Sequence, residues 1–313
     1  MRYLAIGEPL LEFSARRDAP STFDRRPGGD TLNTAIYLSR LIGAGKVGYL
    51  SCLGDDPQSQ WLRQSIADEG IDVSTLAARE GGRPGLSFIS TDAEGERSFV
   101  YWRDQSPFRS HFDDAEVLKG LDAADTIFLS AVTLAVLLPR GRANLLAALS
   151  KRRDEGARIV LDTNYRRALW SDAATARQVI SDAAALATLV MPSLDDVCAC
   201  FDVTGPDAAM REMMALTDAE IVLTTGGEAV LHRPGSSDQA TCYDLPPPVA
   251  AMDTTGAGDS FDAAFLVARD AGATPAEAIE QASRLAAVVV AHPGAVIPIE
   301  AMPIAVQPGV VAQ

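Results

Sequence analysis

A glycine-containing turn between two aspartates has the clearest chemical potential in this sequence. It comprises residues 253–259, Asp-Thr-Thr-Gly-Ala-Gly-Asp, and an apolar, helix-compatible run follows it. Gly256 and Gly258 permit backbone angles that other residues avoid, so successive N–H groups can point at one spot. The N-terminus of the following helix adds partial positive charge. We therefore predict an anion hole at Gly256, Ala257 and Gly258, with Asp259 at its rim as the base that phosphoryl transfer to a hydroxyl needs.

The same turn has a purely structural interpretation, a helix N-cap preceded by glycine. The two flanking aspartates favour the catalytic interpretation. The pattern is neither a Walker loop nor a dinucleotide fingerprint, because it has no Gly-Lys-Ser or Gly-Lys-Thr and no three-glycine run follows the first strand. A nicotinamide-dependent oxidoreductase is therefore disfavoured.

The composition narrows the class of protein. The chain has 313 residues, 47% of them hydrophobic, and a formal net charge of −15. This charge argues against partners such as nucleic acid or an anionic membrane surface. We find no secretory signal and no apolar run long enough to cross a bilayer, so we expect a cytoplasmic protein. The cysteines fit no zinc pattern and are expected to be reduced thiols; they are Cys52, Cys198, Cys200 and Cys242.

Short apolar runs alternate with helix-length segments along most of the chain. We predict strands at 3–6, 47–51, 126–130, 158–162, 189–191 and 221–224, and helices at 33–41, 58–69, 142–155, 173–187, 259–271 and 275–290. This alternation indicates a parallel sheet covered on both faces. Ligands of such folds bind at the carboxyl ends of the strands.

Two regions interrupt the alternation. Residues 10–26 are polar without a helical period, and residues 86–103 have the pattern of a β-hairpin. Both could belong to a small sheet that projects from the main body and acts as a lid, which would exclude water from a phosphoryl-transfer site. The exposed face of that sheet is also a candidate dimer contact.

Two distant motifs resemble those of the ribokinase-like (PfkB-type) sugar kinase family. They are residues 28–33, Gly-Gly-Asp-Thr-Leu-Asn, and residues 253–261. The resemblance covers nearly the whole chain. It implies a single domain over 1–313, a three-layer α/β/α sandwich with a mainly parallel central sheet, and lid segments at about 10–30 and 86–106. It also implies ATP as phosphoryl donor, Mg²⁺, and in some cases a monovalent cation.

Four stretches resemble the branch of the family that phosphorylates 2-keto-3-deoxygluconate (KDG). They are residues 28–40, 95–103, 162–170 and 294–298. The substrate would be a sugar acid, and its carboxylate could be held by Arg103 and Arg166 through charge-assisted hydrogen bonds. Tyr101 could donate its hydroxyl at the same end of the substrate.

The resemblance assigns further roles position by position. Gly29 would let the backbone approach the sugar closely. Asp253 would accept hydrogen bonds from the hydroxyls of the sugar, and Asp259 would take the proton from the attacking hydroxyl. The other substrate-binding candidates are Asn33 and Ser87, and the nucleotide-binding candidates are Asn164, Ser193, Thr224, Gly226 and Gly227. We assign no metal ligands, because Glu8 and Glu12 after the first strand could equally form a solvated acidic edge.

Three departures from the family pattern affect the expected pocket rather than the reaction. Similar kinases often have a tyrosine where this chain has Ser87, a lysine at Thr224 and a glycine at Ala229. The alternatives therefore remain a fructokinase, a kinase of another keto-deoxy sugar acid, and a catalytically silent sugar sensor. The retained Asp259 argues against the silent sensor.

Overall fold

A computed structural model describes residues 1–16, 19, 21–91, 97–247 and 249–303. Its strands are β1 Tyr3–Ile6, β2 Leu10–Ala15, β3 Phe23–Gly28, β4 Val47–Gly54, β5 Leu76–Arg79, β6 Gly85–Thr91, β7 Arg97–Trp102, β8 Thr126–Ser130, β9 Arg158–Asp162, β10 Leu189–Met191, β11 Glu220–Thr224, β12 Ala229–Arg233 and β13 Thr241–Asp244. Its α-helices are α1 Asp30–Ile42, α2 Pro57–Asp68, α3 Ala131–Val136, α4 Pro139–Asp154, α5 Ala173–Leu186, α6 Leu194–Phe201, α7 Pro206–Leu216, α8 Ala257–Asp270 and α9 Pro275–Val290. Short 3₁₀ segments lie at Pro107–Asp113, Ala115–Ala123, Arg167–Leu169 and Ile299–Ala301.

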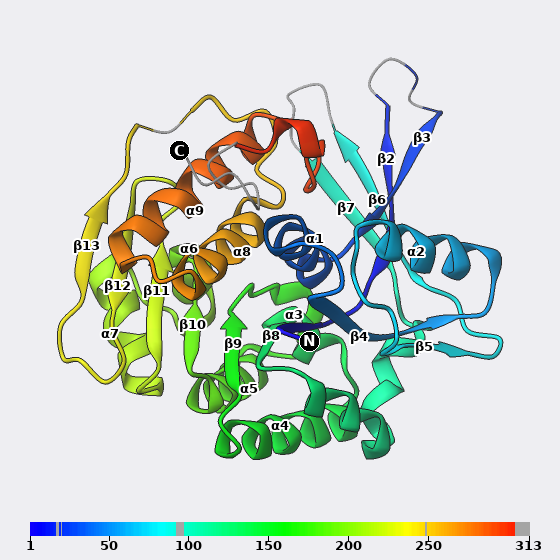
Figure 1. Cartoon of the computed structure of the whole chain (residues 1–313), viewed down its shortest axis with the longest axis horizontal. Helices are drawn as coiled ribbons and strands as arrows, with labels where there is room; N and C mark the ends of the chain where they lie inside the picture. Colours follow the sequence, from blue (N-terminus) through cyan, green and yellow to red (C-terminus); the bar gives the residue numbers. More distant parts are fainter. Residues whose placement is uncertain (17–18, 20, 92–96, 248, 304–313) are drawn as a thin grey trace.

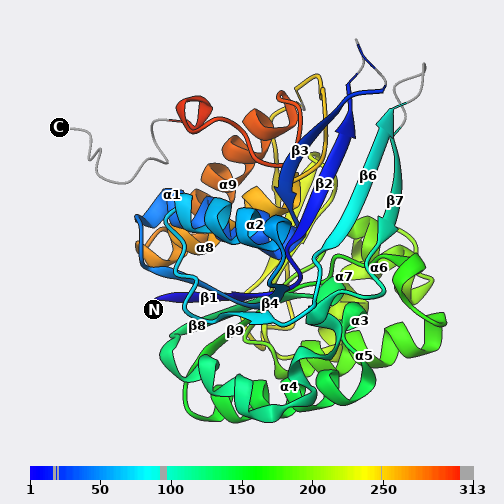
Figure 2. The same ribbon diagram turned by 90° about the vertical axis from the view of Figure 1, so that its right-hand side faces the viewer.

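A large sheet forms the centre of the molecule, with strand order β13-β12-β11-β10-β9-β8-β1-β4-β5 in the described residues. Neighbours from β11 to β5 pair in parallel, and β12 pairs antiparallel with both β11 and β13. Helices α1, α2, α8 and α9 pack on one face, and α3 to α7 pack on the other (Figures 1 and 2). The predicted mainly parallel sheet with helical layers is therefore confirmed.

The strand residues explain why both faces are covered. All four residues of β1 and all eight of β4 are buried, so neither strand has a face suited to water. Two apolar cores result, one under each helical layer. No helix in the described segments has the length and apolar character needed to span a membrane.

A second, four-stranded sheet with the order β3-β2-β6-β7 projects from the body, as Figure 2 shows. We call it the small sheet. Within it β2 pairs antiparallel with β3 and parallel with β6, and β6 pairs antiparallel with β7. The predicted hairpin is confirmed in its two strands; its predicted turn at 92–96 lies outside the described residues.

Candidate active site

The turn before α8 has the geometry of an anion site. Gly256 precedes the helix with a φ of +79°, a conformation that favours glycine. A Cβ at Gly256 would lie 2.4 Å from the carbonyl oxygen of Ala295, so a larger residue would also collide with the backbone. Gly258, in the first turn of α8, has open space where a Cβ would stand. The first N–H groups of a helix lack intrahelical acceptors, so this end of α8 offers donors and positive partial charge to an anion.

Asp259 is buried beside this turn, with 9% of its surface exposed. It lies in the first turn of α8 because the helix begins at Ala257, two residues earlier than predicted. Asn33 Nδ2 donates to Asp259 Oδ2 over 2.8 Å. Burial, and after it the charge of Asp30, raises the pKa of Asp259 to about 8, although the Asn33 hydrogen bond and the charge of Arg166 act in the opposite direction. The two predicted residues Asn33 and Asp259 are therefore brought together.

Asp253 anchors the turn. Its Oδ1 accepts from the Thr255 backbone N–H at 3.0 Å and from the Thr255 hydroxyl at 2.7 Å. Its Oδ2 accepts from the Gly294 N–H at 2.7 Å. Both oxygens thus bind donors of the protein, and the carboxylate ties the turn to the segment 294–298. This arrangement gives Asp253 a structural role, and the acceptance of substrate hydroxyls by its remaining lone pairs stays a prediction.

The other predicted glycine, Gly29, also serves a contact within the protein. It has a φ of +124°, and a Cβ there would lie 2.7 Å from the carbonyl oxygen of Glu8. This close approach brings the start of α1 against the chain that leaves β1. Packing within the protein therefore also explains why this position requires a glycine, beside the predicted close approach of the backbone to a sugar.

The small sheet presents a row of polar side chains across its strands. Arg26 is the register partner of Glu12, Glu12 of Ser87, and Ser87 of Tyr101. Directly opposed residues lie on the same face of a sheet. The charge of Glu12 is among the causes that raise the pKa of Asp259, so Glu12 lies within electrostatic range of the proposed base. Ser87 is 1% exposed, and Tyr101 is 47% exposed.

The two predicted carboxylate-binding arginines differ in their surroundings. Arg103 is buried, and its Nε donates to Glu8 Oε2 over 2.7 Å, with Nη2 bound to the same oxygen. Its charge is thus matched by Glu8, a partner that the sequence interpretation missed. The Arg166 side chain is 61% exposed, and its Nη1 lies 3.7 Å from Asp196 Oδ1. Arg166 is the more accessible of the two for an anion.

The predicted nucleotide side occupies the carboxyl ends of β9, β10 and β11. Asn164 Nδ2 donates to Asp30 Oδ2 over 2.7 Å. Ser193 caps α6 and forms a parallel bridge with Thr224. Gly226 and Gly227 follow with φ values of +74° and +99° in the tight turn before β12. The strand ends thus place these predicted residues at one edge of the sheet.

Three carboxyl groups around this edge were not predicted from the sequence: Asp262, which is buried, and Asp162 and Asp196, which are partly buried. Burial is the first cause that raises the pKa of Asp162, Asp196 and Asp262. The charge of Asp196 adds to it for Asp162, and the charge of Asp162 adds to it for Asp262. The available signal was their position, at the end of β9 for Asp162, in the first turn of α6 for Asp196 and one turn after Asp259 for Asp262. No group of three or more acidic, histidine or cysteine side chains within the described residues is arranged to hold a metal ion.

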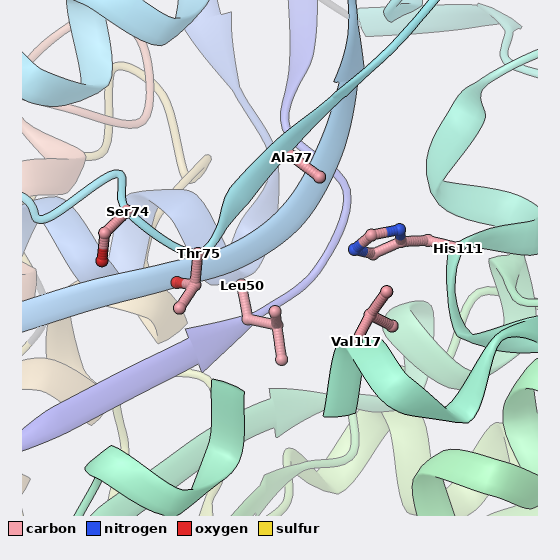
Figure 3. Close-up of a pocket in the computed structure, with 6 residues that line it drawn as sticks. All are labelled: Leu50, Ser74, Thr75, Ala77, His111 and Val117. Carbon is pink, nitrogen blue, oxygen red and sulfur yellow. The ribbon is translucent and has the colours of Figure 1, made fainter. Parts of the chain in front are cut away.

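A separate hollow of about 240 Å³ lies away from these residues, between β4, β5 and the 3₁₀ segments. Figure 3 shows the side chains that line it, with His111 opposite Leu50 and Thr75. Burial, and after it the charge of Arg79, lowers the pKa of His111 to about 4, so the ring is neutral at pH 7. None of the predicted site residues lines this hollow, and we assign it no role.

Comparisons with known proteins agree with the fold and the motifs. The sequence pattern of the pfkB family of carbohydrate kinases matches residues 3–302. The 2-dehydro-3-deoxygluconokinase of Dickeya dadantii (strain 3937) is 34% identical over 304 residues, covering 95% of this chain and 97% of that protein. The Escherichia coli K12 protein of the same name is 32% identical over the same shares of the two chains.

Solved structures give the same fold. The 2-dehydro-3-deoxygluconokinase of Thermotoga maritima superposes with a TM-score of 0.81 at 21% identity, covering 96% of this chain and 98% of that one. A putative ribokinase II of E. coli in complex with ATP and Mg²⁺ also gives 0.81, at 20% identity and 96% coverage of both chains. With a family match along almost its full length and relatives above 30% identity, the chain belongs to the pfkB family of carbohydrate kinases.

Proposed function

We propose that this protein transfers the γ-phosphoryl group of ATP to the 6-hydroxyl of KDG, which is also called 2-dehydro-3-deoxygluconate. Relatives of that name at 32–34% identity support the substrate. The observation that carries the reaction is the buried carboxyl group of Asp259 on the first turn of α8, beside the N–H groups of that helix end. A carboxylate next to an anion-binding helix end can take a proton from a hydroxyl while the phosphoryl charge is stabilised.

In the proposed reaction Asn33 orients Asp259, and Asp259 removes the proton of the attacking hydroxyl. The N-terminus of α8, at Gly256, Ala257 and Gly258, stabilises the negative charge of the phosphoryl group during transfer. With a pKa of about 8, Asp259 is mostly protonated near pH 7 in the empty protein. A cation that arrives with the nucleotide would favour the ionised, basic form.

The nucleotide phosphates are proposed to lie along the strand ends, near Asn164, Ser193 and the loop Thr224-Thr225-Gly226-Gly227. Mg²⁺ fits the excess of carboxyl groups there, and we propose that Asp162 and Asp196 support it beside the phosphates. Bound Mg²⁺ supplies positive charge that neutralises the phosphate oxygens. A monovalent cation is a further candidate requirement, tested by exchanging K⁺ for Na⁺ in the assay.

On the substrate side, we propose that Arg166, Tyr101 and Ser87 contact the acid end of KDG. Arg103 would also contact the acid end of KDG while it stays bound to Glu8, since a guanidinium has five donors and can bind two acceptors. The substrate would thus lie between the small sheet and the end of α8. We propose that the small sheet is the lid of a single kinase domain.

The outer face of the lid supports a proposed dimer contact. Phe88 packs on Phe13, Phe23 and Trp102, with ring centroids 5.2, 5.9 and 4.8 Å away. Trp102 is 63% exposed and Val100 is 53% exposed. A second copy of this face would cover these apolar groups. Analytical ultracentrifugation of the wild type and of Trp102→Ser tests this, with a monomeric wild type as the contrary result.

The substrate is tested by a coupled ADP-release assay with ATP and Mg²⁺ on KDG, its galactonate epimer, fructose and ribose. We expect the highest kcat/KM on KDG. A fructokinase is the second candidate, since relatives of that name match at 25–28% identity, and a preference for fructose would replace the sugar-acid proposal. We also propose a cytoplasmic location, where ATP is supplied; fractionation of cells tests it.

A further inference from the structure

Arg26 is a cationic side chain on the site-facing side of the small sheet. It stands opposite Glu12 in the β2–β3 ladder. Glu12 lies on the same side as Gly28, because a Cβ at Gly28 would lie 2.3 Å from Glu12 Cδ. The charge of Glu12 is felt at Asp259, where it raises the pKa. Arg26 therefore lies on the face of the small sheet that also carries Glu12, Ser87 and Tyr101.

The guanidinium of Arg26 reaches from the small sheet to the loop beside the anion hole. Its Nη1 donates to the carbonyl oxygen of Pro293 over 3.4 Å. A Cβ at Gly294 would lie 2.7 Å from the same nitrogen, so the guanidinium lies directly over this glycine. Gly294 in turn donates its N–H to Asp253, which anchors the turn. Arg26 is thus next to the structure that supports the phosphoryl site.

The guanidinium of Arg26, unlike those of the other two arginines at the site, has a backbone carbonyl oxygen as its partner. Arg103 is paired with Glu8, and Arg166 lies near Asp196. Arg26 forms no ion pair within the ranges that the structure describes, and its hydrogen bond there goes to a backbone carbonyl at the long end of the normal range. An anionic oxygen would compete well for this guanidinium, because it carries a full negative charge and a carbonyl oxygen does not.

We propose that Arg26 is a substrate-binding residue that contacts an anionic oxygen of the sugar acid or of the phosphoryl group in transfer. The inference rests on the proposed function, which brings both anions to this face. Because Arg26 is carried by the small sheet, its bond to the anion also draws β3 towards the end of α8. The surrounding carboxyl groups repel the same anions, so one further positive charge here has a large effect on their binding.

The neighbouring Arg25 provides a matched control. It lies on the opposite side of β3, where its guanidinium sits 3.8 Å over the ring of Trp61 and donates to Gln58. We compare Arg26→Ala, Arg26→Gln and Arg26→Lys with Arg25→Ala, after verifying folding by circular dichroism. The Gln variant keeps the side-chain stem if Ala is poorly folded. Steady-state kcat and KM are measured for KDG and ATP at low and high salt.

We expect kcat/KM on KDG to fall by roughly tenfold or more in Arg26→Ala and Arg26→Gln, the scale of a lost hydrogen bond to a charged group. The Lys variant should recover part of the loss, and Arg25→Ala should stay within about twofold of the wild type. A rise in KM for KDG at constant kcat would identify the carboxylate as the bound anion. A fall in kcat at constant KM would identify the phosphoryl group.

Equal kinetics of Arg26→Ala and Arg25→Ala, in a wild type that phosphorylates KDG, would overturn this inference alone. A wild type inactive on KDG would overturn the proposed function and the inference with it. A loss that is the same in the Lys and Ala variants would also refute the role, because it would show that the charge is not what matters.

Discussion

Replacing Asp259 by asparagine should abolish catalysis while stabilising the fold. Asparagine has the same shape, and its carbonyl oxygen can still accept from Asn33. It cannot accept the proton of the attacking hydroxyl. We expect turnover to fall by at least about two orders of magnitude, the usual scale for loss of a general base, with substrate binding retained.

The stability gain follows from the pKa of Asp259, which folding raises from 3.8 to about 8, first through burial and then through Asp30. Between these two values the folded state holds a proton that the unfolded state has released. Stability of the wild type must therefore fall with rising pH relative to the variant, by about 1.4 kcal/mol per pH unit for one proton. The difference in the free energy of unfolding between the variant and the wild type should be small near pH 3.8. It should reach at most about 4 kcal/mol at pH 7 and level off above about pH 8.

Urea unfolding of both proteins at pH 5, 6, 7 and 8 measures this difference, and coupled ADP release measures turnover. The pH profile of kcat/KM for the wild type gives an independent value, since it reports the free enzyme and should rise with pH up to about 8. A stability difference that is constant from pH 5 to pH 8 would show that Asp259 is ionised throughout. Near-normal turnover of the variant would remove Asp259 as the base.

Three further predictions concern the surroundings of Asp259. Gly256→Ala should lower the free energy of unfolding in urea, because Gly256 has a left-handed φ and lies against the Ala295 backbone. Gly258→Val should fold but lose turnover, because its side chain would fill the space of the anion. Wild-type turnover of folded Gly258→Val would mean that no anion binds there. Arg166→Ala should reduce kcat/KM on KDG by roughly one to two orders of magnitude with little change on fructose. Arg103→Ala should have the same effect on kcat/KM and should also lower the free energy of unfolding by about 3–5 kcal/mol, since it leaves Glu8 buried and unpaired. Equal losses on both sugars would refute acid selection by Arg166, and a Glu8→Gln background should restore the stability of Arg103→Ala. Amide hydrogen exchange in the small sheet should slow when KDG is added while β8 and β9 stay unchanged; identical exchange with and without KDG would refute the lid.

The helices with strong local signals were predictable from the sequence. Helix α9 has the predicted bounds because Thr274 and Glu277 form a capping box and Pro275 occupies the first turn. The helices α3, α6 and α7 were missed, as were the strands β5, β12 and β13, which lie at or next to the edges of the large sheet. Apart from α7, which has 11 residues, these elements have four to eight residues, which is too few periods to distinguish a helix from a strand.

The motif residues of the site were also predictable, but their partners were not. The pair of Glu8 and Arg103 joins residues 95 positions apart, and only the fold brings them together. Likewise, nothing in the sequence around Asp253 indicates that its carboxylate binds Gly294. Local patterns identify residue types that suit a reaction, whereas hydrogen bonding and burial depend on the tertiary structure.

The contact between Gly256 and Ala295 links the turn before α8 to helix α1. The segment 294–298 is held on α1 by Tyr37, whose hydroxyl donates to the Ala295 carbonyl oxygen, and by Arg40, which donates to the Ile297 carbonyl oxygen. Helix α1 also carries Asn33, whose side-chain amide donates to Asp259 on α8. The two helices are thus joined twice, directly through Asn33 and indirectly through residues 294–298. A displacement of α1 would therefore disturb the proposed base and the turn before it together.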